Sequence, residues 1–366
     1  MRINTTVRHQ TYQSMHELRA RIHRGEKLPT QVAIPDVHGV FEQLRIILAT
    51  KQVHAADQVI FLGDYFDRGA GPEDVFKRLV ALNRKNPKYV FLLGNHELNM
   101  LMALRGSAPD FLCWLMNGGL PQIRKHIYAQ AFFDAIDRER ASCGYDELPK
   151  LMNAVFTKHR EAFDNCLRAV GKNDYFIEVF NWLVENCRLF HVDALGTLYL
   201  HAGIEFNGQL EVEILDHLAA CERSFVESLK NNKTEPPAVV PKFRKNLEMR
   251  PNEWLDPLCE EEEMWGEIMV RQALYIRGIR GLVCGHTPRA EALVTGRRIF
   301  GIDLENLIGS RGFYKGCGGF LEMGENGVIC HQFYGMISTE LQPHVLIPRD
   351  EYRDILLADA ESLIAN

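Results

Sequence analysis

Five short apolar stretches, each followed directly by polar residues, constrain the fold of this chain more than any other feature of its sequence. The stretches are Gln31–Ile34, Gln58–Leu62, Tyr89–Leu93, Thr197–Leu200 and Gly281–Cys284. Their length is that of buried strands, and apolar residues at helical spacing follow the first of them between positions 40 and 48. Strands that alternate with helices indicate an α/β fold, in which ligands collect beyond the carboxyl ends of the strands. We therefore expect the five polar clusters to meet at one place.

Three later stretches predict further strands. Arg298–Ile302, Gly319–Met323 and Val328–Phe333 are short and separated by glycines, which indicates an added sheet of hairpins and a layered β-sandwich core. Residues 101–189 have a helical composition and predict a helical insertion, either a cap over the site or extra packing around one core. We expect one catalytic domain at residues 1–346, including this insertion, and a C-terminal extension at 347–366.

The charge and the cysteines narrow the classes of function. The 366 residues include 42 basic and 48 acidic ones, a net charge of -6, so no basic field favours a nucleic acid. The longest apolar runs are far shorter than the ~20 residues of a membrane span. The N-terminal residues lack a signal-peptide pattern, and the nine cysteines form no C-x-x-C pair. We expect a soluble cytoplasmic protein with no nucleic-acid partner; the sequence identifies no regulatory partner.

Mixed oxygen and nitrogen donors follow the five strands. They belong to Asp36, His38, Asp64, Asn95, His201 and His286. This donor set suits two hard-to-borderline divalent ions. Asp64 comes first after its strand, so we expect its carboxylate to bridge ions ~3.5–4 Å apart, which would share a hydroxide able to attack phosphorus at neutral pH. The pattern predicts a two-metal phosphoesterase.

Three further residues complete the predicted chemistry. Arg68, four residues after Asp64, can bind two phosphate oxygens with its planar fork. His96, beside Asn95, is placed to protonate the leaving oxygen, with Asp67 as the partner that keeps it charged.

The ordered motifs resemble those of a known family. They are Asp36-Val-His-Gly, Gly63-Asp-Tyr-Phe-Asp-Arg-Gly, Gly94-Asn-His-Glu, His201-Ala-Gly and Gly285-His-Thr-Pro. This series is similar to the calcineurin-like metallophosphoesterases, in particular the phosphoprotein phosphatase branch. The resemblance implies a central β-sandwich flanked by helices, with manganese as the expected metal and iron or zinc as alternatives.

The resemblance also implies roles for individual residues. One ion would be held by Asp36, His38 and Asp64, and the other by Asp64, Asn95, His201 and His286. The catalytic roles would fall to His96, Asp67 and Arg68, with Arg68, Asn95 and His96 contacting the substrate phosphate.

Departures from the pattern place the chain near bacterial-type members. Leu93 stands where eukaryotic protein phosphatases usually have Arg, and Trp114-Leu-Met-Asn-Gly-Gly119 resembles a segment of Shewanella-like and diadenosine-tetraphosphatase-like members. Those groups often carry a second phosphate-binding Arg shortly after a Trp, whereas Gly-Glu follows Trp265 here. Arg271 is our candidate for that role, with Arg277 and Arg280 as alternatives.

The function expected from these observations is dephosphorylation of phosphoserine or phosphothreonine in a phosphoprotein substrate, with phosphotyrosine open if the pocket is deep. A diadenosine-polyphosphate or nucleotide hydrolase is the first alternative, and an inactive binding module on a phosphatase fold is the second. The net charge of -6 favours the peptide substrate. The long helical segment and the C-terminal extension are similar to phosphatase effectors that intracellular bacteria inject, which would place the action in a host cell.

Overall fold

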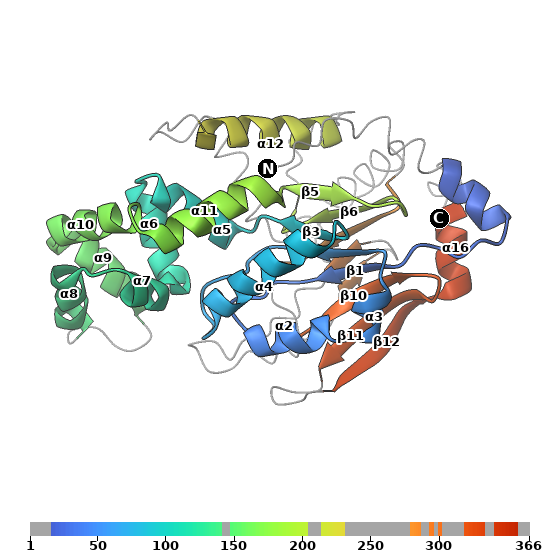
Figure 1. Cartoon of the computed structure of the whole chain (residues 1–366), viewed down its shortest axis with the longest axis horizontal. Helices are drawn as coiled ribbons and strands as arrows, with labels where there is room; N and C mark the ends of the chain where they lie inside the picture. Colours follow the sequence, from blue (N-terminus) through green and yellow to red (C-terminus); the bar gives the residue numbers. More distant parts are fainter. Residues whose placement is uncertain are drawn as a thin grey trace, which may run out of the picture.

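Two β-sheets form the centre of the molecule (Figure 1). The computed structural model describes residues 16–140, 147–203, 214–230, 279–286, 293–295, 299–301, 318–333 and 340–357. Within these residues the larger sheet has the order β12-β11-β10-β1-β2-β3-β4 and the smaller one the order β5-β6-β7-β9-β8. The strands of the larger sheet are β1 (Gln31–Ile34), β2 (Gln58–Phe61), β3 (Tyr89–Leu92), β4 (Cys187–Arg188), β10 (Gly319–Gly324), β11 (Gly327–Phe333) and β12 (Leu341–Pro348). Those of the smaller sheet are β5 (Phe190–Val192), β6 (Thr197–Leu200), β7 (Gly281–Cys284), β8 (Leu293–Thr295) and β9 (Ile299–Gly301).

All five strands expected before polar clusters are present, but they belong to two sheets. β1, β2 and β3 are parallel neighbours in the larger sheet, and β6 and β7 are parallel neighbours in the smaller one. The prediction of a separate sheet of hairpins is wrong. The β10–β11 hairpin pairs antiparallel with β1 and extends the larger sheet, while β9 joins β7. The free edge of β1 supplies the physical reason, because its unpaired backbone groups need a partner.

The two sheets pack face to face. One buried cluster contains Ala33, Ile60 and Leu92 of the larger sheet together with Tyr199 and Val283 of the smaller one. The residues that alternate with them point to the opposite faces and join a second cluster with the helices. Because side chains alternate between the two faces of a strand, each sheet contributes one face to the inner layer. The expected α/β architecture, a β-sandwich flanked by helices, is confirmed.

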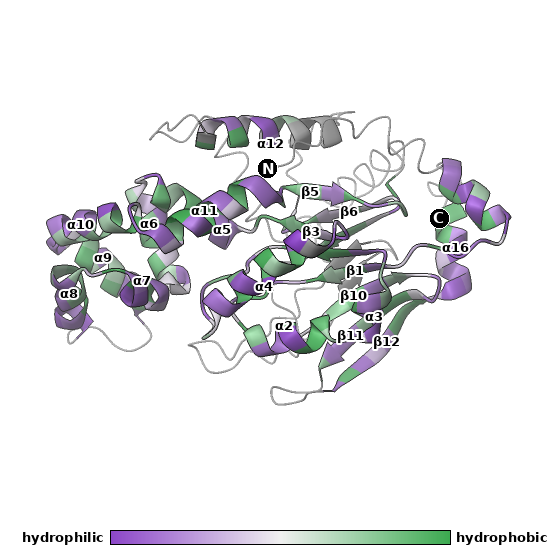
Figure 2. Ribbon diagram, in the orientation of Figure 1, coloured by the Kyte–Doolittle hydropathy of each residue, from purple (hydrophilic) through white to green (hydrophobic). Residues whose placement is uncertain are grey.

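Helices cover the outer faces. They are α2 (Phe41–Leu48), α3 (Lys51–Ala55), α4 (Pro72–Lys85), α5 (Asn95–Leu104), α11 (Asp174–Asn186), α12 (Ile214–Lys230) and α16 (Arg349–Leu357). Figure 2 shows hydrophobic residues along the strands and hydrophilic residues on the outer sides of helices such as α4. β12 crosses residue 346, where we predict that the catalytic domain ends, and α16 follows it directly. The division of the chain into domains stays a prediction.

The expected helical insertion forms a lobe at one end of the sandwich (Figure 1). Besides α5 and α11 it contains α6 (Ala108–Trp114), a π-helical turn (Leu115–Gly119), α7 (Leu120–His126), α8 (Gln130–Arg140), α9 (Leu148–Lys158) and α10 (Arg160–Val170). In α10 the buried residues are Phe163, Cys166, Leu167 and Val170, the three- and four-residue spacing of an amphipathic helix. The buried residues of the lobe belong to the same apolar cluster as the outward-facing residues of the strands, so the lobe and the sandwich share one core.

Candidate active site

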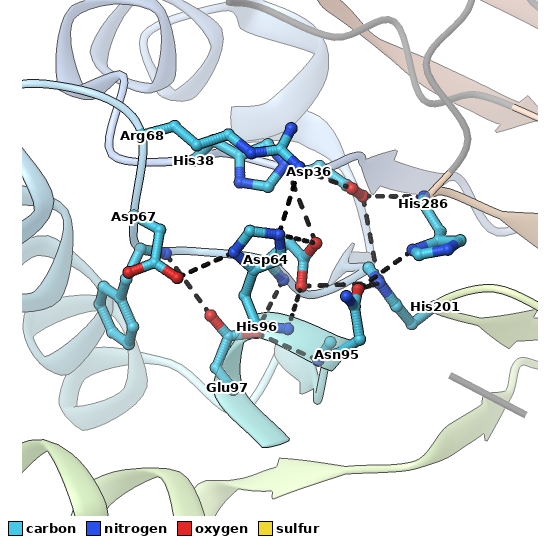
Figure 3. Close-up of polar contacts among 12 residues, drawn as sticks. Asp36, His38, Asp64, Asp67, Arg68, Asn95, His96, Glu97, His201 and His286 are labelled. Carbon is cyan, nitrogen blue, oxygen red and sulfur yellow. Dashed lines mark hydrogen bonds and ion pairs between the residues drawn. The ribbon is translucent and has the colours of Figure 1, made fainter. Parts of the chain in front are cut away.

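The predicted site residues meet beyond the carboxyl ends of β1, β2, β3, β6 and β7 (Figure 3). Asp36 and His38 follow β1, Asp64 follows β2, and Asn95 opens α5 after β3. His201 directly follows β6, and His286 lies two residues beyond β7. Parallel strands end on the same side of a sheet, and the 3.5 Å distance from His201 Nε2 to Asp64 Oδ1 shows that these sides of the two sheets meet.

Asp64 lies at the centre of this group. Its Oδ2 is 3.8 Å from Nε2 of His38 and 3.7 Å from Nε2 of His96. Its Oδ1 is 3.5 Å from Nε2 of His201. Possible ligand atoms therefore form two groups that share Asp64, one with His38 and His96 and the other with His201 and His286, each spanning at most 4.8 Å. A carboxylate with one oxygen in each group has the placement that a bridging ligand needs.

The position of the hydrogen on the His201 ring indicates that a cation fits beside His201 and Asn95. Its Nδ1 lies 2.8 Å from the carbonyl oxygen of Leu62, an acceptor, so Nδ1 carries the hydrogen. In the neutral ring Nε2 then presents a lone pair, and this lone pair faces Oδ1 of Asn95 at 3.0 Å. Oδ1 of Asn95 is also 3.1 Å from Nδ1 of His286. A divalent ion bound to these oxygen and nitrogen atoms would turn a repulsive contact into a favourable one.

Asp36 lies close to both groups of possible ligand atoms. Its Oδ1 accepts a hydrogen bond from the backbone N–H of His286 at 3.2 Å and lies 3.9 Å from Nδ1 of His201. Its Oδ2 is 3.8 Å from Nε2 of His38. A Cβ atom at Gly285 would collide with Oδ1 of Asp36, so only glycine allows β7 to end so close to this carboxylate.

The backbone of the site is strained. Among the described residues, every non-glycine residue with positive φ is a predicted site residue; these are His38, Asp64, Asp67, Arg68 and His286. Such conformations cost of order 1–3 kcal/mol each and persist where the surrounding structure enforces them, commonly at functional sites.

His96 forms a pair with Asp67. Nδ1 of His96 is 2.8 Å from Oδ2 of Asp67, and both side chains are buried. Nε2 of His96 is 3.3 Å from Nη2 of the exposed Arg68. His96, the candidate acid, therefore lies between Asp67 on one side and Arg68 on the other, and the roles of the three residues stay a prediction. The other oxygen of Asp67 accepts hydrogen bonds from Trp114 and Gln122, two contacts that the sequence did not reveal.

Glu97 is a further residue that the sequence analysis assigned no role. It is fully buried, and its carboxylate accepts hydrogen bonds from the backbone N–H groups of Asp64 (2.8 Å), Tyr65 (2.8 Å) and Gly94 (3.1 Å). Burial and the charge of Asp64 raise the pKa of Glu97 to about 8, whereas these donors favour its charged form. The contact from the Gly94 N–H to Glu97, three residues later, is the half of a helix capping box that does not need a side chain at the N-cap.

The directions of the pKa shifts differ between the histidines proposed to bind metal and His96, the proposed acid. Burial lowers the pKa of both His38 and His201, which keeps these imidazoles neutral and able to bind a metal. Burial opposes ionisation of Asp64, but the charge of the neighbouring His96 outweighs it and lowers the pKa of Asp64. Burial also opposes protonation of His96, but the carboxylates of Asp64 and Asp67 outweigh it and raise its pKa.

The second phosphate-binding arginine is not located. Arg271 and Arg277 lie outside the described residues. Arg280 directly precedes β7, and its backbone N–H donates to the carbonyl of Gly196. The four-residue strand then separates it by about 13 Å from the end that carries His286. Arg280 is therefore at the wrong end of β7 for this role.

A two-layer sandwich with these side chains at its strand ends defines a metal-dependent phosphoesterase. The chain belongs to the calcineurin-like phosphoesterase family, whose sequence profile matches residues 30–290. Members of this family use divalent metal ions, in agreement with the two groups of ligand atoms around Asp64.

The chain is also similar to individual proteins, in sequence over a short stretch and in fold over most of its length. Over 72 residues the chain is 35% identical to the serine/threonine-protein phosphatase 6 catalytic subunit of Drosophila melanogaster, a match covering 19% of this chain and 24% of that protein. The chain thus spans about a quarter of the length of this relative. Its fold is similar to that of a cold-active protein tyrosine phosphatase (TM-score 0.52, 16% identity, 89% of this chain and 80% of the other). A cold-active protein-tyrosine phosphatase of a psychrophilic Shewanella species is similar to the same degree (TM-score 0.51, 16% identity, 86% and 80%).

Within the described part of the chain, the helices are too short or too polar to cross a membrane.

Proposed function

We propose that this protein is a metal-dependent protein phosphatase that hydrolyses phosphoserine and phosphothreonine monoesters, and phosphotyrosine if the pocket admits the longer side chain. One observation carries the proposal. Nε2 of His96 lies 3.7 Å from Asp64 and 3.3 Å from Arg68, so a proton donor, a shared carboxylate and a guanidinium meet at one point. The similarity to a serine/threonine phosphatase over 72 residues supports the choice of substrate.

We assign the metal ligands as the family resemblance implies. Asp36, His38 and Asp64 would hold one divalent ion, and Asp64, Asn95, His201 and His286 a second, with manganese expected and iron or zinc as alternatives. When bound, the ions would lower the pKa of water and neutralise phosphate charge.

The remaining residues act on the substrate. The planar fork of Arg68, which is exposed, binds two phosphate oxygens, and Asn95 and His96 approach the same group. When the bond between phosphorus and the serine oxygen breaks, its electron pair stays on that oxygen. An alkoxide is a poor leaving group, so proton transfer from Nε2 of His96 to this oxygen accelerates the step, and Asp67 stabilises the charged ring.

The test is turnover of phosphoserine, phosphothreonine and phosphotyrosine peptides beside p-nitrophenyl phosphate and diadenosine tetraphosphate, with manganese restored after chelation. We expect manganese-dependent phosphate release from the peptides. The relative rates rank phosphoserine, phosphothreonine and phosphotyrosine as substrates. Cleavage of the dinucleotide alone would replace the proposal by a nucleotide hydrolase. If no substrate reacts and no metal binds, the chain is an inactive binding module.

A further inference from the structure

The outer oxygen of Asp67 is held by the helical insertion. Nε1 of Trp114, the last residue of α6, donates to Oδ1 of Asp67 at 2.8 Å, and Nε2 of Gln122 in α7 donates to the same oxygen at 3.2 Å. The side chain of Asp67 is completely buried, and its other oxygen faces His96. The Asp67 carboxylate thus joins the insertion to the proposed acid.

The insertion also packs directly against the backbone beside Asp67. Gly118 in the π-helical turn has a φ of 107°, and a Cβ atom there would lie 2.7 Å from the backbone nitrogen of Arg68. A Cβ atom at Gly119 would collide with the indole of Trp114. The two glycines of the segment Trp114–Gly119 therefore permit a close fit against a turn in which Asp67 and Arg68 both have positive φ.

Trp114 has little freedom to move. It is fully buried, with its ring 5.4 Å from Phe176 and 6.2 Å from Phe111 between centroids. An indole N–H can only donate, so Oδ1 of Asp67 can only accept from it. Any proton that Asp67 shares must then lie on the Oδ2 side, between Asp67 and His96. The two donors also fix the plane of the carboxylate and, through it, the direction of the His96 ring.

We propose that Trp114 and Gln122 are positioning residues for protonation of the leaving group, acting through Asp67 on His96. The inference rests on the proposed phosphatase function. It gives the helical insertion a specific role, because the Trp114–Gly119 segment packs against the turn that contains Asp67 and Arg68.

Leaving groups that differ in basicity provide the test. Phenyl phosphate and a phosphoserine peptide release strongly basic oxygens that need a proton, whereas p-nitrophenyl phosphate releases a weakly basic one. We expect Trp114→Phe and Gln122→Met to lower turnover of the first two about 10- to 100-fold, and of p-nitrophenyl phosphate less than about threefold. Bound metal, measured by mass spectrometry, should not change.

Trp182→Phe is the matched control. Trp182 in α11 belongs to the same insertion, is 8% exposed and packs 5.2 Å from Phe91, but its Nε1 has no hydrogen-bond partner among the described residues. This variant loses an indole without losing a contact to Asp67. It should lower turnover of strongly and weakly basic leaving groups by the same factor, or lower neither.

A double-mutant cycle tests whether the effect passes through Asp67. Adding Trp114→Phe to Asp67→Asn should reduce turnover no further, since the indole would have no carboxylate to orient. The indole ¹⁵N–¹H resonance lost in Trp114→Phe should shift in Asp67→Asn, a readout that needs no metal and no turnover.

The outcomes separate this inference from the proposed function. An active wild type whose Trp114→Phe and Gln122→Met variants lose equal activity on all esters, or lose none, would overturn the positioning role alone. Additive losses in the double mutant would overturn it as well. A wild type inactive on every ester with manganese present would reject the phosphatase function and this inference together. If Trp114→Phe does not fold, the effect of Gln122→Met on strongly and weakly basic leaving groups still decides.

Discussion

Nδ1 of His96 lies 2.8 Å from Oδ2 of Asp67, although the two residues follow different strands of the larger sheet. The contact requires the turn after β2 and the first turn of α5 to face each other. Glu97 holds them in that relation, because its carboxylate accepts N–H groups from both segments. His96, the proposed proton donor, and Asp64, the carboxylate shared by the two groups of ligand atoms, are thus parts of one hydrogen-bonded unit.

Asp64→Asn should abolish metal binding and turnover together. The amide keeps the size of the side chain but removes the negative charge that both proposed metal sites share, and it places an N–H₂ group against histidine nitrogens at 3.5–3.8 Å. Mass spectrometry of the purified protein should find less than one equivalent of manganese. Two retained equivalents would show that Asp64 is not the bridge.

His96→Asn should separate metal binding from chemistry. The variant keeps the proposed metal ligands but lacks the proton donor, so we expect full metal content and a turnover of phosphoserine peptides reduced by about 10²–10⁴-fold. Parallel metal analysis of this variant and Asp64→Asn provides the comparison. Equal metal loss in both would contradict the division of roles.

Glu97→Gln should destabilise the fold and loosen the site. Its carboxylate accepts three backbone N–H groups in a buried position, and an amide cannot accept all of them, so we expect a loss of about 1–3 kcal/mol in the free energy of unfolding. Urea denaturation without metal measures this loss. The control is Glu42→Gln, whose exposed pair with Arg45 should contribute less than about 1 kcal/mol. Equal losses of unfolding free energy in the two variants would contradict a stabilising role of the Glu97 carboxylate.

Glu222→Gln should change how stability depends on pH. Burial of Glu222, which belongs to α12, raises its pKa to about 7, from an ordinary value of 4.5. Between these two pH values the folded state binds more protons than the unfolded state, so stability falls as pH rises from 4.5 to 7. Above pH 7 the charged carboxylate costs about 3 kcal/mol, and the neutral amide should recover much of it. Unfolding free energies at about pH 5 and about pH 8 should therefore differ less in the variant. An unchanged difference would contradict the buried position of Glu222.

The strands that carry the site could be predicted because their signals are local. An apolar run that leads within one or two residues into Asp, Asn or His is a local signal, and β1, β2, β3, β6 and β7 were all found this way. The metal-ligand candidates and the pairing of His96 with Asp67 followed from the order of the motifs. Glu97 was missed, because glycine at position 94 leaves the sequence without the Ser or Thr that marks a capping box.

The remaining features depend on contacts between distant parts of the chain. Local sequence does not show that β6 and β7 belong to a second sheet, because strand pairing is set by packing and by backbone hydrogen bonding across the whole fold. It also does not show that Trp114 and Gln122 reach Asp67, since side-chain direction in the insertion depends on the kink at Gly118. The sequence alone determined which residues stand at the strand ends and hence the chemistry available. The tertiary structure decided which of them touch, because packing of the two sheets and the helical lobe brings them within hydrogen-bonding distance.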